Sequence, residues 1–476
     1  MTGAEGRRTD YDLIVVGAGP AGENVGDYAT KRGLRVAIVE AELVGGECSY
    51  WACMPSKALL RSGHAIRAAR RLAGAREAVE GVIDASAVLA RRSSFTDQWK
   101  DDGQVSWLDS AGIDLIRGRG RIAGPGEVRV DDRVYSAGAV ALATGSVPVL
   151  PEIPGLAAAS PWTTRDATAT DRVPPRLLVI GGGVAGTELA VAFTSLGSRV
   201  TLLSRDGLLS HEEPFVGEHL ADALADEGVD LRLGVTPARV DRGDDGIVSV
   251  VLADGTELRA EELLVATGRR PNTEHLGLET IGLDARPGLR VDETMLVDGT
   301  DWLYAVGDVN GRALLTHQGK YQARAAGEAI AARLQGSPVS DELWGDHAAS
   351  ADHLAVPRVV FSDPEVASVG LTESRARAQG LDVRAVEYDL GRVAGAKLHA
   401  DGYTGRAKLV VDEGRSVIVG ATFVGQDVAE LLHSATIAIV GEVPIDRLWH
   451  AVPAYPTVSE IWLRLLETYG RPTRRR

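Results

Sequence analysis

The stretch Gly17-Ala18-Gly19-Pro20-Ala21-Gly22 follows the apolar residues 11–16 and predicts the turn from a buried strand into a helix. In a Rossmann unit Gly17 permits the tight turn, Gly19 lets the backbone approach a pyrophosphate, and Gly22 lets the helix pack on the strand. The helix start adds free amides and a positive dipole end. Residues 35–39 form the next apolar strand, and Glu40 follows it. Because a carboxylate there accepts hydrogen bonds from ribose hydroxyls, the stretch predicts a dinucleotide site.

A second glycine run repeats this pattern in the middle of the chain. Residues 177–180 are apolar and lead into Gly181, Gly183 and Gly186, and the next strand is expected at residues 199–203. Ser204 and Arg205 follow that strand, where the first unit has a carboxylate. Because a guanidinium suits a 2′-phosphate, we expect NADPH to be preferred, with NADH possible. The alternative is that Arg205 is a solvated surface charge.

The chain has only two cysteines, and both lie in the run Cys48-Ser49-Tyr50-Trp51-Ala52-Cys53-Met54-Pro55-Ser56-Lys57. In a reducing compartment a cycling pair is more plausible than a structural bridge. Residues five apart on a regular helix point in different directions, so the pair requires an irregular turn before a helix at residues 57–71. The dipole of that helix would lower a thiol pKa. Buried inert thiols and a zinc site are alternatives, and no second cysteine pair supports zinc.

Length and composition place the chain among soluble multidomain proteins. With 476 residues, 45% of them hydrophobic, we expect about three domains. The formal charge of −15 disfavours nucleic acid and acidic membranes as partners. No apolar run approaches the ~20 residues that cross a bilayer. Residues 1–8 lack a signal-peptide core, so a cytoplasmic protein is expected. Arg471 and residues 474–476 are interpreted as a solvated tail.

Taken together, these motifs resemble the class I pyridine nucleotide-disulfide oxidoreductases of the lipoamide dehydrogenase, glutathione reductase and mercuric reductase type. The resemblance covers nearly the whole chain. It includes the further runs Ala143-Thr144-Gly145, Ala266-Thr267-Gly268-Arg269-Arg270-Pro271-Asn272, Tyr304-Ala305-Val306-Gly307-Asp308 and Asp363-Pro364-Glu365-Val366-Ala367-Ser368-Val369-Gly370.

The resemblance implies FAD in the first dinucleotide site, NAD(P)H in the second, and a homodimer. It implies that Asp308 hydrogen-bonds the ribityl chain of FAD, although a simple turn residue fits the same position. The residues expected to contact the cofactors are Gly17, Gly19, Gly22, Glu40, Thr144, Gly145, Gly181, Gly183, Gly186, Ser204, Arg205, Gly268 and Asp308.

The resemblance also assigns catalytic roles. Cys53 is the thiolate next to the flavin, and Cys48 attacks an outside disulfide. Lys57 pairs with Glu188 beside the flavin, where positive charge stabilises the reduced anionic ring. The alternative for the last two is an ordinary helix lysine and a glutamate at a helix start.

The C-terminal segment Tyr455-Pro456-Thr457-Val458-Ser459-Glu460 departs from the family pattern. Most members have a histidine base at the first position, supplied by the partner subunit and oriented by the glutamate. A phenol, with an ordinary pKa near 10, accepts protons far less readily at neutral pH than an imidazole near 6.5. His450 is an alternative base, although a structural role is more common for such a histidine. Mercuric reductases and soluble transhydrogenases share this tyrosine, but the former add a C-terminal cysteine pair and the latter lack the second cysteine.

The predicted architecture is α/β, with two Rossmann-like dinucleotide-binding domains and a C-terminal α+β dimerisation domain. The expected segments are residues 1–154 for the first part of the FAD domain, 155–282 for the NAD(P) domain, 283–345 for the rest of the FAD domain, and 346–476 for the interface domain. We expect surface helices within residues 61–95, a helix beginning near His317, and strands at residues 406–411 and 417–423.

The sequence predicts an enzyme that passes electrons from NADPH through FAD to a Cys48–Cys53 disulfide and on to a disulfide or other small oxidant. One alternative is a diaphorase, quinone reductase or transhydrogenase that uses the flavin directly. Another is a noncatalytic redox sensor. Nucleic acid, membranes and metals are not expected as partners.

Overall fold

A computed structural model describes residues 10–284 and 288–471. Two sequence predictions concern residues outside this range: the lack of a signal-peptide core in residues 1–8 and the solvated tail at residues 474–476. The chain divides into two compact units. Unit 1 comprises Met1–Met54, Ser93–Val149 and Arg269–Asp352, and unit 2 comprises Pro55–Arg92, Leu150–Gly268 and His353–Arg476.

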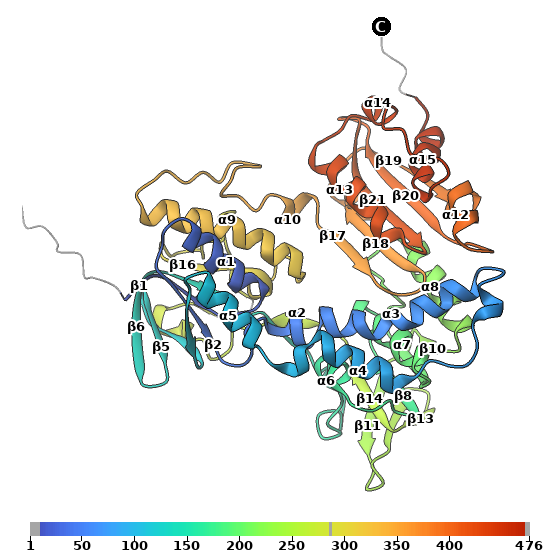
Figure 1. Ribbon diagram of the computed structural model, residues 1–476, viewed down its shortest axis with the longest axis horizontal. Coiled ribbons are helices and arrows are strands. Elements are labelled where there is room, and N and C mark those ends of the chain that lie inside the picture. Colours follow the sequence, from blue (N-terminus) through green and yellow to red (C-terminus); the bar gives the residue numbers. More distant parts are fainter. Residues whose placement is uncertain (1–9, 285–287, 472–476) are drawn as a thin grey trace, which may run out of the picture. The chain divides into compact units, whose positions relative to one another are not determined.

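Unit 1 is built on a sheet in the order β3-β2-β1-β6-β5-β4, with β16 also paired to β6 (Figure 1). The strands β2, β1, β6 and β16 run parallel, with Leu13 of β1 opposite Val36 of β2 and Ala139 of β6. Helices α1 and α9 pack against each other beside this sheet. The main elements are β1 (Tyr11–Val16), α1 (Pro20–Lys31), β2 (Val36–Glu40), α2 (Gly46–Tyr50), α5 (Asp102–Ser110), β3 (Asp114–Arg117), β4 (Gly120–Gly124), β5 (Glu127–Val130), β6 (Arg133–Leu142), β7 (Ser146–Pro148), β15 (Arg269–Pro271), β16 (Leu303–Ala305) and α9 (Thr316–Leu334).

The first part of unit 2 repeats the parallel βαβ arrangement in the order β10-β9-β8-β14. Strands β8 and β9 are nearly continuous apolar runs, which is typical of a sheet buried on both faces. Its elements are α3 (Cys53–Arg70), which begins in unit 1, α4 (Ala85–Phe95), α6 (Thr164–Ala169), β8 (Arg176–Ile180), α7 (Val184–Ser195), β9 (Arg199–Ser204), α8 (Pro214–Asp226), β10 (Asp230–Leu233), β11 (Pro237–Arg242), β12 (Val248–Leu252), β13 (Glu257–Ala260) and β14 (Glu262–Val265).

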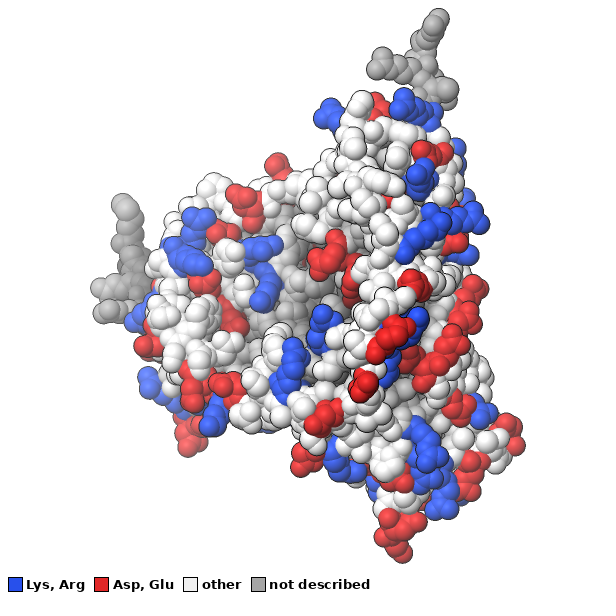
Figure 2. All heavy atoms as spheres, turned by 45° about the vertical axis from the view of Figure 1, so that its right-hand side comes forward, with Lys and Arg blue, Asp and Glu red and all other residues white. Residues whose placement is uncertain are grey.

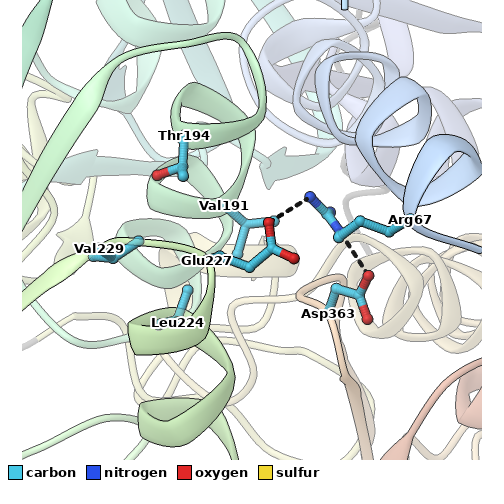
Figure 3. Close-up of a pocket in the computed structure, with 7 residues that line it drawn as sticks. All are labelled: Arg67, Val191, Thr194, Leu224, Glu227, Val229 and Asp363. Carbon is cyan, nitrogen blue, oxygen red and sulfur yellow. Dashed lines mark hydrogen bonds and ion pairs between the residues drawn. The ribbon is translucent and has the colours of Figure 1, made fainter. Parts of the chain in front are cut away.

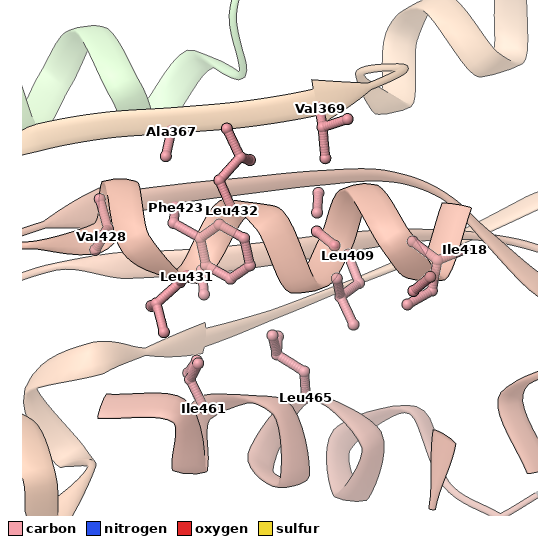
Figure 4. Packing of buried hydrophobic residues seen from close by; sticks show 14 of the residues in the cluster. Ala367, Val369, Leu409, Ile418, Phe423, Val428, Leu431, Leu432, Ile461 and Leu465 are labelled. Carbon is pink, nitrogen blue, oxygen red and sulfur yellow. The ribbon is translucent and has the colours of Figure 1, made fainter. Parts of the chain in front are cut away.

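The C-terminal part of unit 2 is an antiparallel sheet in the order β17-β18-β21-β20-β19. Leu432 from α13 and Ile461 and Leu465 from α15 point with Phe423 of β21 into one apolar core (Figure 4). Its elements are α10 (Ala351–Leu354), β17 (Pro357–Val360), β18 (Glu365–Gly370), α11 (Glu373–Ala378), β19 (Val383–Asp389), α12 (Ala394–His399), β20 (Arg406–Asp412), β21 (Val417–Gly425), α13 (Leu432–Val440), α14 (Ile445–Leu448) and α15 (Ile461–Tyr469).

The predicted fold class is confirmed, because two parallel βαβ sheets precede an antiparallel sheet with helices. The expected strands at residues 406–411 and 417–423 are β20 and β21. The interpretation of residues 61–95 as surface helices is wrong at Arg92, which is 2% exposed. Its guanidinium donates hydrogen bonds to the carbonyls of Thr168 and Thr170, and these partners permit its burial. The division into four domain segments stays a prediction.

Candidate active site

The first glycine loop has the geometry that a dinucleotide pyrophosphate requires. Gly17 has a φ of +104°, and a Cβ there would collide with the Ala143 carbonyl. A Cβ at Gly22 would collide with the carbonyl of Gly17, so α1 packs closely on β1. Gly19, the N-cap of α1, faces open space, since an added Cβ would meet no described atom within 4 Å. The loop therefore fits a phosphate group against the amide end of α1.

The second glycine loop, before α7, repeats this geometry. Gly181 has a φ of +124°, and an added Cβ would collide with the Ala266 carbonyl. Gly186 faces the Gly181 carbonyl just as closely, and Gly183 opens to space at the helix start. The two glycine loops have the same backbone geometry and follow strands of two separate sheets. The chain therefore has one candidate pyrophosphate site for each of two dinucleotides.

The strand ends beside the two loops differ. Glu40, the last residue of β2, accepts hydrogen bonds from the amides of Ala18 and Glu42, each at 2.7 Å, and so fixes the first loop. Ser204 ends β9 and is buried, and its hydroxyl donates to the Gly207 carbonyl at 2.6 Å. Arg205 is exposed and pairs with Asp206 at 2.7 Å. A 2′-phosphate would therefore share the Arg205 guanidinium with a neighbouring carboxylate.

Asp308 lies in a polar network within unit 1. Ser146 Oγ donates a hydrogen bond to Asp308 Oδ2 at 2.5 Å. Arg269 donates to Ser146 Oγ at 2.7 Å and to Glu47 Oε2 at 2.5 Å. Burial raises the pKa of Asp308, and the Ser146 hydrogen bond and the Arg269 charge oppose that rise. The network fixes the Asp308 carboxyl group through Oδ2, and a carboxylate can accept further hydrogen bonds, for example from a hydroxyl ligand.

Thr144 and Gly145 lie next to this network and are held by the Asn272 backbone. Thr144 Oγ1 donates to the Asn272 carbonyl at 2.7 Å, and the Asn272 amide donates to the Gly145 carbonyl at 2.9 Å. Gly145 and Gly268 have φ values of +72° and +136°, and an added Cβ on either would meet no described atom within 4 Å. Each glycine, Gly145 in unit 1 and Gly268 in unit 2, leaves open space beside its own backbone.

The two cysteines lie side by side, on either side of a break between two helices. Cys48 is in the short helix α2, and Cys53 is the first residue of α3. Gly45 and Gly46, with φ values of +110° and +59°, form the turn into α2, and the break that the spacing predicts lies at Trp51, where α2 ends with a φ of −137°. No disulfide joins the two cysteines, and their thiols form a hydrogen bond. Thr316 Oγ1, at the start of α9, lies 3.3 Å from Cys53 Sγ.

The two thiols have different electrostatic surroundings. The hydrogen bond to Cys53 and then burial raise the pKa of Cys48, while Thr316 and the Lys320 charge oppose the rise. Cys48 does not lie at the start of α3, and the predicted effect of the helix dipole on a thiol pKa stays a prediction. Cys53 does lie there, where the dipole favours an anion. The surroundings of Cys48 favour its protonated form.

Lys57 and Glu188 form the ion pair that the resemblance implies. Lys57 Nζ on α3 lies 2.8 Å from Glu188 Oε2 on α7. The other carboxylate oxygen of Glu188 accepts the Phe361 amide at 2.9 Å, and the Glu188 side chain is only 4% exposed. Lys57 also lies 4.8 Å from the Phe361 ring centroid. The contact is present, and its role beside a flavin stays a prediction.

The structure does not join the C-terminal residues into a proton relay within one chain. Tyr455 is 77% exposed, and Glu460 is buried and accepts the Gly395 amide at 3.3 Å. His450 is exposed in the turn after α14. A proton-handling role for any of the three stays a prediction.

Sequence reasoning missed Thr316, Arg269, Glu47 and Ser146 as members of these networks. Arg269 belongs to the Ala-Thr-Gly-Arg run used for the resemblance, so a signal for it existed. For Thr316 the sequence offered only the prediction that a helix begins near His317, and that prediction does not indicate a contact with a thiol. Its contact with Cys53 joins residues 263 positions apart, and local pattern does not encode such a contact.

A separate buried cluster in unit 2 surrounds a small cavity (Figure 3). Arg67 Nε lies 2.6 Å from Asp363 Oδ2, and Arg67 Nη1 donates to Ser195 Oγ at 2.7 Å. Arg71 Nη2 reaches the other Asp363 oxygen at 2.9 Å. The residues that line the cavity are Arg67, Val191, Thr194, Leu224, Glu227, Val229 and Asp363. None is a predicted site residue, so we interpret the cluster as structural.

Acidic and basic side chains intermingle over the face in Figure 2. Among the helices that the structure describes, none combines the length and apolarity needed to span a bilayer. In the same residues no group of three or more His, Cys, Asp or Glu side chains is arranged to hold a metal ion.

Comparison with known proteins gives consistent matches along the chain. Residues 11–332 match the family model described as pyridine nucleotide-disulphide oxidoreductase, and residues 356–465 match the dimerisation domain of that family. The chain is 31% identical to mercuric reductase of Staphylococcus aureus, over 95% of this chain and 81% of that protein. It is 32% identical to glutathione reductase of Burkholderia cepacia, over 96% and 99% respectively.

Solved structures agree with these matches. The HOCl-induced flavoprotein disulfide reductase RclA from Escherichia coli is 25% identical, with a TM-score of 0.82 over 97% of this chain and all of that one. LpdA from Mycobacterium tuberculosis is 27% identical, with a TM-score of 0.80 over 96% of this chain and all of that one.

Proposed function

The chain belongs to the class I pyridine nucleotide-disulfide oxidoreductase family, and we propose that it passes electrons from NADPH through FAD to the Cys48–Cys53 pair and on to a disulfide or another small oxidant. As a member of the family it is an NAD(P)H-dependent flavoprotein oxidoreductase with FAD and NAD(P)H as cofactors, and it carries a dimerisation domain. The observation that carries the proposal is the Cys48 thiol hydrogen-bonded to Cys53 at the start of a helix.

The chain's own residues account for cofactor binding in this proposal. The loop at Gly17 and Gly19 holds the FAD pyrophosphate, and the loop at Gly181 and Gly183 holds that of NADPH. Asp308, fixed by Ser146, accepts a hydroxyl of the ribityl chain. A bound FAD would supply the hydride-accepting group for NADPH and the route by which an electron pair reduces the Cys48–Cys53 disulfide to the dithiol.

The two thiols act in successive steps of the reaction with a disulfide substrate. A Cys48 thiolate attacks one sulfur of the substrate disulfide, a mixed disulfide forms, and the first product thiolate leaves. The Cys53 thiolate then attacks Cys48 Sγ, the mixed disulfide breaks, and the second product thiolate leaves. Each product thiolate takes up one proton, and the protein ends with the Cys48–Cys53 disulfide. Thr316 Oγ1 stays within hydrogen-bonding distance of Cys53 and steadies its charge.

The second candidate is direct use of the flavin, as in a diaphorase, quinone reductase or transhydrogenase. The observation that favours it is Tyr455, which is exposed and stands where most family members have the histidine base. In the homodimer we propose that Tyr455 and Glu460 of each subunit face the flavin site of the other. A tyrosine there donates a hydrogen bond but is a weak base at neutral pH.

A panel of electron acceptors separates the two candidates. Wild-type enzyme and Cys48→Ser are assayed with NADPH against low-molecular-weight disulfides, quinones and one-electron dyes. Loss of disulfide reduction in Cys48→Ser, with quinone and dye reduction kept, supports the proposal. Equal rates of the two proteins toward every acceptor would reject a role for the dithiol. NADH in place of NADPH measures the coenzyme preference in the same assay.

A further inference from the structure

The segment between α4 and α5 contains a strained turn that the proposed mechanism does not use. Asp97, Gln98 and Trp99 have φ values of +47°, +55° and +56°, so three successive residues other than glycine lie in the left-handed region. In this conformation the Cβ atom crowds the following carbonyl oxygen, which makes it rare even for single residues. Such a turn persists only where its surroundings hold it. We call residues 97–101 the strap.

The contacts of the strap lie on the segment that carries Cys48. The Trp99 indole Nε1 donates a hydrogen bond to the Tyr50 carbonyl at 3.2 Å. The Tyr50 hydroxyl lies 3.3 Å from the Lys100 carbonyl and 3.0 Å from the Val44 carbonyl. Asp101 Oδ2 accepts a hydrogen bond from the Val44 amide at 2.8 Å. Three successive residues of the strap therefore contact both sides of the turn and short helix in which Cys48 lies.

Tyr50 is the residue at which the strap meets the break between the two cysteines. It ends α2, the break at Trp51 follows, and Cys53 then begins α3. The Tyr50 side chain is 3% exposed, and its ring centroid lies 5.6 Å from that of Trp51. The two thiols can meet only while this break keeps its shape, because residues five apart on a regular helix point in different directions. The strap therefore holds the residue from which the break starts.

We propose that the strap positions the thiol pair, with Trp99 as a positioning residue that acts through the Tyr50 carbonyl. The proposal rests on the proposed function, in which Cys48 and Cys53 cycle between dithiol and disulfide. Two thiols that are held close together form a disulfide more readily than two mobile ones, because closing the bridge then costs less chain entropy. Since the turn is strained, loss of the Trp99 hydrogen bond lets it relax and frees Tyr50. The pair then shifts towards the dithiol.

The test measures the equilibrium between the dithiol and the disulfide. FAD-bound holoenzyme is equilibrated under nitrogen at pH 7 with mixtures of reduced and oxidised dithiothreitol, and alkylation followed by mass spectrometry gives the disulfide fraction. In this exchange two S–H bonds break and one S–S bond forms on the protein, while oxidised dithiothreitol takes up both protons and both electrons.

Trp99→Phe keeps an aromatic ring and loses the N–H group. We expect it to lower the equilibrium constant for disulfide formation about three- to tenfold, the range that one hydrogen bond supports. Trp302→Phe is the matched control, because Trp302 is also a partly buried tryptophan of unit 1 but packs on a different apolar cluster. It should leave the constant unchanged.

Gln98 provides a second test at an exposed position of the strap. Glycine adopts a positive φ without steric cost, so Gln98→Gly relieves the strain and keeps the strap in place. We expect it to raise the urea midpoint and to leave the disulfide constant within about twofold. Proline fixes φ near about −65°, so Gln98→Pro excludes the turn and should lower the constant as much as Trp99→Phe does.

A Trp99→Phe constant equal to that of wild type would overturn the proposal. So would equal falls in Trp99→Phe and Trp302→Phe, or an unchanged constant in Gln98→Pro. If Trp99→Phe retains no FAD, the two Gln98 variants decide the outcome. The measurement involves neither NADPH nor the acceptors of the panel. A wild-type enzyme that fails in the acceptor panel while the variants show these shifts would therefore reject the proposed function and support the role of the strap.

Discussion

The Lys57–Glu188 ion pair predicts an asymmetric response to substitution. Glu188 is 4% exposed and Lys57 is 35% exposed, so removing the lysine leaves a buried charge while removing the glutamate leaves a hydrated one. Lys57→Met should therefore destabilise the fold more than Glu188→Gln. In Glu188→Gln the side-chain oxygen still accepts the Phe361 amide, which limits the loss further.

The size of the effect follows from the geometry. At 2.8 Å the gross attraction is about 6 kcal/mol with an effective dielectric constant near 20. Most of this offsets the cost of burying the carboxylate. Protonating a glutamate of ordinary pKa at pH 7 costs about 3.7 kcal/mol. This value is an upper limit on the destabilisation by Lys57→Met, because a buried carboxylate that has lost its partner can take up a proton. We expect losses of about 3 kcal/mol for Lys57→Met, about 1 kcal/mol for Glu188→Gln and about 2 kcal/mol for the double variant.

Urea unfolding of the FAD-saturated protein at one fixed concentration measures these losses, with tryptophan fluorescence as the signal. The three variants and wild type form a double-mutant cycle with a coupling free energy of about 2 kcal/mol. Lys57→Arg is the control and should keep most of the stability. Losses that add within about 0.5 kcal/mol would refute the reasoning, because the two side chains would then act independently.

Three further predictions concern other parts of the chain. Burial raises the pKa of Glu365 to about 7, so its folded form binds a proton more tightly than the unfolded chain, and its contribution to stability falls as the pH rises from about 4.5 to 7. Glu365→Gln should flatten that fall in urea midpoints measured from pH 5 to 8. Asp363→Asn removes the 2.6 Å ion pair of the buried Arg67 guanidinium and leaves it only the longer pair with Glu227 at 3.7 Å, so it should lower the unfolding free energy by about 3 kcal/mol, with a lower thermal midpoint as the readout. Arg205→Met should raise KM for NADPH about tenfold and leave KM for NADH within about twofold, and equal changes for both would contradict a 2′-phosphate contact.

The fold could be predicted from the sequence where backbone geometry dictates the residue. Gly17 and Gly181 both have positive φ and a carbonyl in the space that a side chain would fill, so only glycine fits the turn. The irregular turn between Cys48 and Cys53 could also be predicted, because five residues of regular helix cannot bring two thiols together.

Contacts between distant residues could not be predicted from local pattern. Lys57 and Glu188 are 131 residues apart, and only the family resemblance paired them. Arg92 has the helical spacing of a surface residue, yet it is buried, and its guanidinium donates hydrogen bonds to the carbonyls of residues 168 and 170. Ser204 lies at the expected strand end, but its hydroxyl donates a hydrogen bond to the Gly207 carbonyl. The pattern of strand residues does not reveal this bond.

Anaerobic titration with NADPH is the most direct test of electron flow from flavin to sulfur. The account predicts that each wild-type subunit takes up four electrons and develops a long-wavelength absorbance band, and that Cys53→Ser takes up two and shows no band. A wild-type endpoint of two electrons, or a band that persists in Cys53→Ser, would contradict the account.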